Sequence, residues 1–322
     1  MKLTLVATCL FGLEHLLGEE IEALGYERIS TIDGRVTFAG DEEAIALSNI
    51  FLRYAERVFI KVGSFRAESF EELFEGVKAL NWSDYIGKSD AFPVKGHAIK
   101  SKLHSIPDCQ AIIKKAVVRS LSNVYGIEQF EESGIKYQIE FFILNDIATL
   151  MIDTSGIALH KRGYRKDSLG APIRETLAAA IVATSRPREN VLLWDPMCGS
   201  GTIAIEAAMM MKNIAPGRGR NFAAEEFAFI NKSVWKNARE EAFDLEKTTE
   251  FQAFASDIDP AAVKLAEKNV RLAGVGDVVR VFHQDARKIS ADGRRGTIVC
   301  NPPYGERLGT IKEAEQLYKE IG

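Results

Sequence analysis

Apolar and amphipathic segments alternate along the whole chain, and their periods predict a mixture of strands and helices. In the first part, the expected elements are a strand at residues 3–8, a helix at 13–24, a strand at 35–38, a helix at 41–51 and a strand at 57–65. Alternation in this order is typical of a ferredoxin-like fold. We therefore expect a first α+β domain at residues 1–65.

Residues 66–158 also alternate between strand-like and helix-like hydrophobic patterns. Neither this segment nor the one before it contains a glycine-rich nucleotide loop. A helix is expected at 69–80, where Ser69 can cap the first turn and Glu72 stands three residues on. Next come an extended segment at 92–102, a helix from Pro107 to about Leu121, and two hairpin strands at 137–143 and 147–152. These residues are expected to form a second α+β domain.

From residue 159 onward, buried strands alternate with helices. Strands are expected at residues 191–194, 251–256, 278–282 and 297–300, and helices at 203–212, 260–269 and 310–321. Asp259 is a good N-cap and Pro260 a good first residue for the second of these helices. The alternation predicts a Rossmann-like α/β domain with a parallel sheet at residues 159–322.

Polar residues follow each of the four predicted strands: Asp195, Asp257, Asp285 and Asn301. Ligands of open α/β sheets bind at the carboxyl ends of the strands, where all four should lie. Helix capping explains any one of them alone, but it does not easily explain four in order. An acid after the second strand suits ribose hydroxyls, and Asp285 is placed to accept from an adenine amino group.

A glycine turn, Asp195–Thr202, joins the first of these strands to a helix. Gly199 and Gly201 allow backbone N–H groups to approach a ligand at the positive end of that helix. The third glycine of the dinucleotide fingerprint is replaced by Ala204, and the lysine of a phosphate-binding loop is missing. Hydride transfer and phosphoryl transfer are therefore both disfavoured.

The last predicted strand ends in Asn-Pro-Pro-Tyr, residues 301–304. The Asn301 amide oxygen and the Pro302 carbonyl can each accept an N–H from one amino group, which fixes its orientation for attack. Tyr304 offers a ring face on which a base can stack. The motif predicts a site for a planar, amino-bearing target, although such a sequence also occurs in ordinary loops.

Composition narrows the class of protein. The chain of 322 residues is 46% hydrophobic and 27% charged, which is ordinary for a soluble globular protein. No apolar stretch reaches membrane-spanning length, and the N-terminus does not resemble a signal peptide. The four cysteines, Cys9, Cys109, Cys198 and Cys300, contain no CxxC pair, so we expect no metal and no disulfide, and a cytoplasmic location. Cys198 is expected to pack rather than to act as a nucleophile.

Basic residues gather in two places although the formal net charge is −4. The candidates for nucleic-acid contact are Lys100, Lys102, Lys114, Lys115 and Arg119 in the first cluster, and Lys161, Arg162 and Arg165 in the second. Tyr164 in the second cluster could add a stacking face. Most charged segments are simply solvated, but two basic clusters beside the predicted α/β domain favour RNA or DNA as a partner.

The motifs DPMCGSGT, SDIDP, HQDA and NPPYGERLG resemble those of class I S-adenosylmethionine-dependent amino-methyltransferases. The resemblance implies that the donor's methionine part is bound by Asp195, Pro196, Cys198, Gly199 and Gly201. It further implies Asp257 at the ribose, Asp285 at the adenine, and residues 301–304 at the target amino group, with Asn301 also beside the donor. No metal is implied.

Residues 92–96 and 99–103, with the helix after them, resemble a THUMP domain, an RNA-binding module. The segments at 153–165, 171–179 and 213–217 resemble THUMP-bearing bacterial methyltransferases that modify guanine N2 in large-subunit ribosomal RNA. This implies transfer of a methyl group to guanosine N2 in ribosomal RNA. Three alternatives stay open: a tRNA guanine-N2 enzyme, a DNA adenine-N6 enzyme, and a non-catalytic RNA-binding assembly factor.

A full sheet of this methyltransferase class has seven strands, and only about four are recognisable before residue 322. An exposed parallel edge is unfavourable, so we expect a methyltransferase domain that is truncated at the C-terminus, with an edge covered by another chain as the alternative. The sequence leaves the oligomeric state open.

Overall fold

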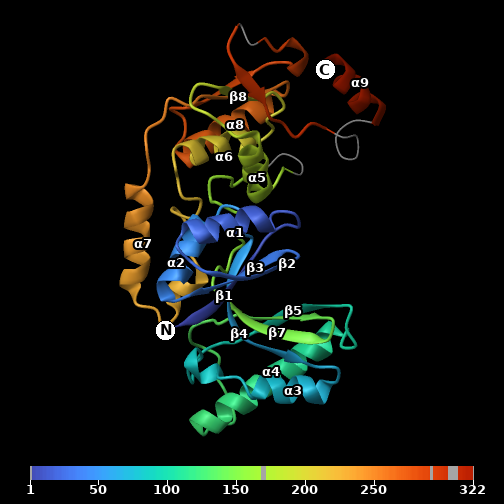
Figure 1. Ribbon diagram of the computed structural model, residues 1–322, viewed down its shortest axis with the longest axis vertical. Coiled ribbons are helices and arrows are strands. Elements are labelled where there is room, and N and C mark those ends of the chain that lie inside the picture. Colours follow the sequence, from blue (N-terminus) through green and yellow to red (C-terminus); the bar gives the residue numbers. More distant parts are fainter. Residues whose placement is uncertain (1, 168–171, 291–292, 304–310, 322) are drawn as a thin grey trace. The chain divides into compact units, whose positions relative to one another are not determined.

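The computed structural model describes residues 2–167, 172–290, 293–303 and 311–321 (Figure 1). The chain forms two compact units. Unit 1 consists of Met1–Asn49, Ala55–Ala158 and Asn221–Ala238, and unit 2 consists of Ile50–Tyr54, Leu159–Arg220 and Arg239–Gly322. Each unit therefore includes one short segment that is distant in sequence from the rest of it.

Unit 1 is built on a seven-stranded sheet with the order β2-β3-β1-β4-β7-β6-β5. Its strands are β1 (Leu3–Thr8), β2 (Arg28–Ile32), β3 (Arg35–Gly40), β4 (Arg57–Arg66), β5 (Val94–Ile99), β6 (Ile139–Leu144) and β7 (Ile147–Asp153). The β5–β6 pair is parallel and the other pairs are antiparallel. Strand β4 pairs with β1 and with β7, so the two predicted α+β parts share one continuous sheet.

The helices described in unit 1 are α1 (Glu14–Ala23), α2 (Glu42–Phe51), α3 (Phe70–Lys78), α4 (Ile106–Tyr125) and most of α7 (Lys232–Asp244). Four of them, α1 to α4, were expected from the sequence, whereas α7 was not. The Ser69 side chain accepts from the Glu72 amide at 3.2 Å, which confirms Ser69 as the cap of α3. Helix α3 packs against α4 (Figure 1).

Unit 2 contains a four-stranded parallel sheet among the described residues, with the order β10-β9-β8-β11. Its strands are β8 (Leu192–Asp195), β9 (Ala253–Asp257), β10 (Val279–His283) and β11 (Gly296–Ile298). Its helices are α5 (Glu175–Ser185), α6 (Thr202–Met211), α8 (Pro260–Ala273) and α9 (Ile311–Ile321). The chain adds β9 and β10 on one side of β8 and then crosses to place β11 on the other, so the strand order reverses beside β8.

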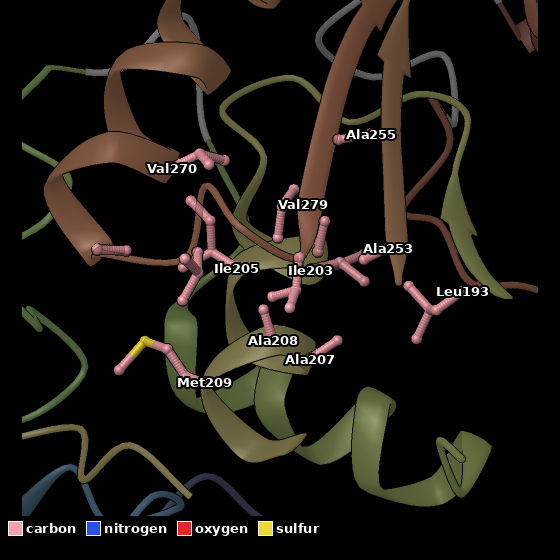
Figure 2. Packing of buried hydrophobic residues seen from close by; sticks show 14 of the residues in the cluster. Leu193, Ile203, Ile205, Ala207, Ala208, Met209, Ala253, Ala255, Val270 and Val279 are labelled. Carbon is pink, nitrogen blue, oxygen red and sulfur yellow. The ribbon is translucent and has the colours of Figure 1, made fainter. Parts of the chain in front are cut away.

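The core of unit 2 is the packing of α6 against the sheet (Figure 2). Ile203 and Ile205 of α6 are buried together with Ala253 of β9 and Val279 of β10. Alanines on both α6 and β9 leave room for close helix–sheet contact. This packing holds the first turn of α6 against the ends of the strands.

We predict that Ile205→Ala lowers the free energy of unfolding of unit 2 by about 2–5 kcal/mol, because it opens a cavity where the side chain is fully buried. Leu272→Ala on α8 is the control, since Leu272 is 48% exposed, and it should change stability by no more than about 0.5 kcal/mol. Urea unfolding followed by circular dichroism measures both. Equal effects would show that the packing of α6 does not limit the stability of unit 2.

Candidate active site at the carboxyl edge of the parallel sheet

The structure brings the four predicted strand-end residues to one edge of the sheet. Asp257 ends β9 and Asp195 ends β8, while Asp285 and Asn301 follow shortly after β10 and β11. With the order β10-β9-β8-β11, these residues stand in the spatial sequence Asp285, Asp257, Asp195, Asn301. Three strand spacings of about 4.8 Å give an edge about 14 Å long.

The glycine turn between β8 and α6 is held against β9. Gly199 and Gly201 adopt left-handed backbone angles, with φ of 51° and 78°. The Gly199 amide donates to the Asp257 carboxylate at 2.9 Å, and the Cys198 amide donates to the Ser256 carbonyl at 3.0 Å. A Cβ on Gly201 would lie 3.1 Å from the Cβ of Ala266, a tight contact with α8, at a backbone angle that favours glycine.

Asp257 organises the middle of this edge. Its second oxygen accepts from the Asp259 amide at 3.0 Å, so backbone groups on both sides fix the carboxylate. Asp259 in turn accepts from the Ala261 amide at 2.8 Å, which confirms it as the N-cap of α8. A carboxylate has about four acceptor positions, and Asp257 can therefore also accept from two hydroxyl groups of a ligand.

Asp195 is the most deeply buried acid of the edge, with 2% of its surface exposed. Its carboxyl accepts from the Met197 amide at 3.3 Å. Burial, with a smaller contribution from the nearby charge of Asp257, raises the pKa of Asp195 to about 8. A cationic group bound beside Asp195 would oppose both effects and favour the carboxylate.

Asp285 is a fixed carboxylate. It caps a short 3₁₀ helix at Ala286–Lys288 and accepts from the Arg287 side chain at 2.9 Å and 2.6 Å. These hydrogen bonds lower the pKa of Asp285 to about 2. Arg287 also pairs with Glu320 of α9 at 3.3 Å. Because Arg287 occupies part of its acceptor capacity, the role of Asp285 at an adenine stays a prediction.

The Asn-Pro-Pro segment begins just after β11. The Val299 amide donates to the Trp194 carbonyl at 3.0 Å, which extends the pairing with β8 beyond the strand. Asn301 is exposed, and the Pro303 carbonyl accepts from the Tyr318 hydroxyl at 2.7 Å. Tyr304 lies outside the described residues, and the target-binding roles of Asn301 and Pro302 stay predictions.

The thiols near the edge do not have the character of nucleophiles. Cys198 is 6% exposed, and burial raises its pKa. Burial also raises the pKa of Cys300 to about 11. Cys198 packs into the core of unit 2, as the sequence analysis predicts.

The second basic cluster is largely buried. Arg162 is 5% exposed and pairs with Glu206 of α6 at 3.5 Å, and the Tyr164 hydroxyl donates to Glu206 at 3.0 Å. Arg165 is mostly buried and pairs with Glu175 of α5 at 2.9 Å. The prediction that Arg162 and Arg165 contact RNA, with Tyr164 as a stacking face, is therefore wrong. Lys161 is exposed.

The first basic cluster divides between paired and open side chains. Lys102 pairs with Glu68, and Lys114 pairs with Glu132 while its ammonium lies 3.5 Å from the centre of the Phe92 ring. Lys100 is exposed.

Lys115 and Arg119 are exposed on α4 and line a hollow of about 430 Å³ with Phe74 and Lys78 of α3. This hollow combines positive charge with an aromatic ring, which suits single-stranded nucleic acid. Another hollow, of about 330 Å³, lies at the amino ends of the parallel strands, beside Leu192, Gln252 and Arg295, and so at the edge opposite Asp195.

Two further classes of feature are missing from the part of the chain that the structure describes. It contains no group of three or more His, Cys, Asp or Glu side chains that could hold a metal ion. Among the described helices, every one is too short or too polar to cross a membrane.

The edge fits a donor of the S-adenosylmethionine type. A Cβ added to Gly199 would meet nothing within 4 Å, so open space lies in front of the glycine turn. The turn leads into the N-terminus of α6, which favours a carboxylate, while Asp257 can accept from ribose hydroxyls.

Family models match along most of the chain. The family model described as "RMKL-like, methyltransferase domain" matches residues 162–322. The model described as "RlmL ferredoxin-like domain" matches residues 4–59, and the model described as "THUMP domain" matches residues 67–153.

Whole-length relatives agree with these matches. The chain is 45% identical to "Putative RNA methyltransferase YpsC" of Bacillus subtilis (strain 168), and the match covers 100% of this chain and 84% of the relative. A "predicted N6-adenine-specific DNA methylase" from Listeria monocytogenes str. 4b F2365 has a similar structure, with a TM-score of 0.94, 44% identity and coverage of 100% of this chain and 85% of the other. The structure of "SMU.472, a putative methyltransferase complexed with SAH" has a TM-score of 0.92 and 41% identity, covering 99% of this chain and 85% of that one.

We predict that Asp195 makes unit 2 less stable as the pH rises. Its native pKa of about 8 lies above the ordinary 3.8, so the native protein binds more protons than the unfolded chain between these values. The contribution of Asp195 to the free energy of unfolding should fall through this window, by at most about 1.4 kcal/mol for each pH unit. Urea unfolding across the window should show the slope in the wild type and a smaller slope in Asp195→Asn.

Asp277→Asn is the control with the opposite sign. A hydrogen bond from Lys212 at 2.6 Å lowers the pKa of Asp277, so its contribution is present above the ordinary pKa and is lost as the pH falls. Identical slopes in the wild type and Asp195→Asn would contradict the proton uptake by Asp195.

Proposed function

We propose a substrate for this chain from the premise that it belongs to the RMKL-like family of THUMP-bearing RNA methyltransferases, which use S-adenosylmethionine. The proposed reaction transfers the methyl group to the exocyclic N2 of a guanosine in large-subunit ribosomal RNA. We also propose the domain boundaries that the sequence predicts, at 65/66 and 158/159.

The spatial order of the strand ends supports this proposal. Asp285, Asp257 and Asp195 stand at or just after the ends of successive strands, in the order in which adenine, ribose and methionine follow one another in the donor. The bound donor supplies an electrophilic methyl group on its sulfonium. Asn301 is next in line, on the far side of β8, so a target held there meets the methionine end of the donor.

Asn301 and Pro302 act on the nucleophile. An exocyclic amino nitrogen is a weak nucleophile, because its lone pair is delocalised into the ring. Two acceptors, the Asn301 amide oxygen and the Pro302 carbonyl, hold both N–H groups and direct the nitrogen in line with the methyl group. After transfer, the extra proton leaves to water. Positioning is therefore the main contribution of this loop.

RNA is held by unit 1 and presented as an unstacked base. We propose that Lys115 and Arg119 contact its phosphates, with the Phe74 ring beside them in the same hollow. A target guanosine within a helix has to be flipped out, at a cost of a few kcal/mol. Contacts that unit 1 makes with the RNA backbone offset that cost.

Three other functions would use some of the same residues or domains. A tRNA guanine-N2 enzyme would use the same edge, and only the substrate distinguishes it. A DNA adenine-N6 enzyme, as the description of the Listeria protein has it, would leave the THUMP domain without a role. A non-catalytic assembly factor would bind RNA without any dependence on the donor or on Asn301.

We predict that the protein transfers labelled methyl from S-adenosylmethionine to unmodified large-subunit ribosomal RNA, and that nucleoside analysis yields N2-methylguanosine. Asn301→Ala should lower the rate by about 10²–10³-fold, the usual loss for one group that stabilises a transition state. Its affinity for S-adenosylhomocysteine should stay within a few-fold of the wild type. Asn190→Ala, an exposed asparagine at the opposite edge of the sheet, is the matched control.

Parallel assays with tRNA and DNA separate the alternatives. Label in tRNA or in DNA, but not in ribosomal RNA, would overturn the proposed target and keep the chemistry. Donor binding without methylation of any nucleic acid, together with RNA affinity that is the same in Asn301→Ala, would favour the assembly factor.

We predict that Lys115→Glu and Arg119→Glu each weaken RNA binding by about tenfold near 0.1 M salt and reduce the slope of log affinity against log salt by about 1. Lys232→Glu, a charge reversal at an exposed lysine of α7 in the same unit, should have a smaller effect. Fluorescence anisotropy with a labelled RNA fragment measures all three. Equal losses in the control would place the RNA on a different surface.

A further inference from the structure

A chain of hydrogen bonds leads from a mostly buried arginine to the glycine turn. Nη1 of Arg165 donates to the Thr202 hydroxyl at 3.0 Å and to the Ile173 carbonyl at 2.9 Å. The Thr202 hydroxyl lies 2.9 Å from the Ser200 hydroxyl. Thr202 and Ser200 are 1% and 7% exposed, so water cannot easily replace these partners. The chain therefore connects Arg165 to the turn in front of α6.

The direction of these hydrogen bonds follows from the chemistry of the groups. A guanidinium can only donate, and each of the two protons on Nη1 has its own acceptor. The Thr202 oxygen therefore accepts from Arg165. Accepting from a cation strengthens the Thr202 hydroxyl as a donor, which favours donation from Thr202 to the Ser200 oxygen over the reverse direction. With this direction, the hydrogen bond to Thr202 does not use the Ser200 proton, which can be donated to a ligand.

Other contacts fix both ends of this chain. Glu175 holds Nη2 of Arg165 at 2.9 Å, which sets the plane of the guanidinium. At the other end, the side chain of buried Asn269 donates to the Ser200 carbonyl at 2.9 Å. Contacts from α5 and α8 thus fix the Arg165 guanidinium and the Ser200 backbone, at the two ends of the hydrogen-bond chain.

We propose that Arg165 is a positioning residue for the methyl donor: through Thr202 it orients the Ser200 hydroxyl to donate to the carboxylate of the donor's methionine part. The N-terminus of α6 adds backbone N–H groups for the same anion. Arg165 itself stays behind the turn and does not touch the donor. The inference concerns donor binding, and it does not depend on which RNA is the target.

The test is a double-mutant cycle on donor affinity, measured by isothermal titration calorimetry with S-adenosylhomocysteine. Arg165→Met should weaken binding by about tenfold, as expected for a hydrogen bond to a charged group. In the Ser200→Ala background, the same substitution should change binding by less than about twofold, because the group that Arg165 orients is missing. Arg271→Met, at an exposed arginine of α8, should leave binding unchanged.

A second ligand separates orientation from damage to the fold. 5′-Methylthioadenosine lacks the methionine carboxylate, so Arg165→Met should leave its affinity within about twofold of the wild type. Thr202→Val interrupts the chain but keeps the Arg165–Glu175 pair, and it should reproduce the loss if Arg165→Met does not fold. Equal effects of Arg165→Met with and without Ser200, or parallel losses with both ligands, would overturn the proposal.

Discussion

The parallel pairing of β8 with a strand on each side is the constraint on which the site depends. Trp194 pairs with Phe254 of β9 and with Ile298 of β11, so one short strand sets the register of both neighbours. Asp195 follows directly, and its neighbours in space are fixed by this register rather than by loop conformation. Side chains that bind different parts of a ligand can therefore be positioned by backbone hydrogen bonds alone.

Buried charge in unit 2 strengthens this arrangement. Glu206 is fully buried on α6, where its removal from water has to be offset by partners, and Arg162 and Tyr164 supply them. Arg165 does the same for Glu175. The segment at residues 162–165 is thus held by paired charges on α6, which begins at the glycine turn, and on α5. Losing one partner alone would leave a buried charge uncompensated.

Much of the fold follows from local signals, which is why the sequence predicts it. The caps at Ser69 and Asp259 and the strand ends at Asp195 and Asp257 depend on residues within a few positions of one another. Strand β2 was not predicted because it lies at a sheet edge with both faces largely exposed, which removes the periodic burial pattern. Helices α5 and α7 were missed as well; α7 is largely polar, and α5 is apolar on most of its faces.

In the site, too, residues set by nearby sequence were predicted, whereas residues whose partners are distant in sequence were not. The acids at the strand ends could be found from their positions alone, whereas Arg162 and Arg165 were assigned to RNA because counting charges ignores burial. Their partners, Glu206 and Glu175, come from helices whose packing is decided by the tertiary fold. A mixed run of lysines and arginines could have raised this possibility, since arginine is the preferred residue for buried ion pairs.

The exchange of short segments between the units has a consequence for how the protein is made. Unit 1 is completed by residues 221–238, where Phe227 stacks on Tyr137 at 4.4 Å and the Ala224 amide donates to the Thr154 carbonyl. Unit 2 likewise includes residues 50–54, where the Ile50 carbonyl accepts from the Gly217 amide at 2.8 Å. During synthesis, the N-terminal unit therefore cannot be completed until the ribosome has produced residues 221–238, which lie well inside the α/β domain. The two units therefore cannot fold one after the other as independent domains, because each needs a segment from the other's part of the sequence.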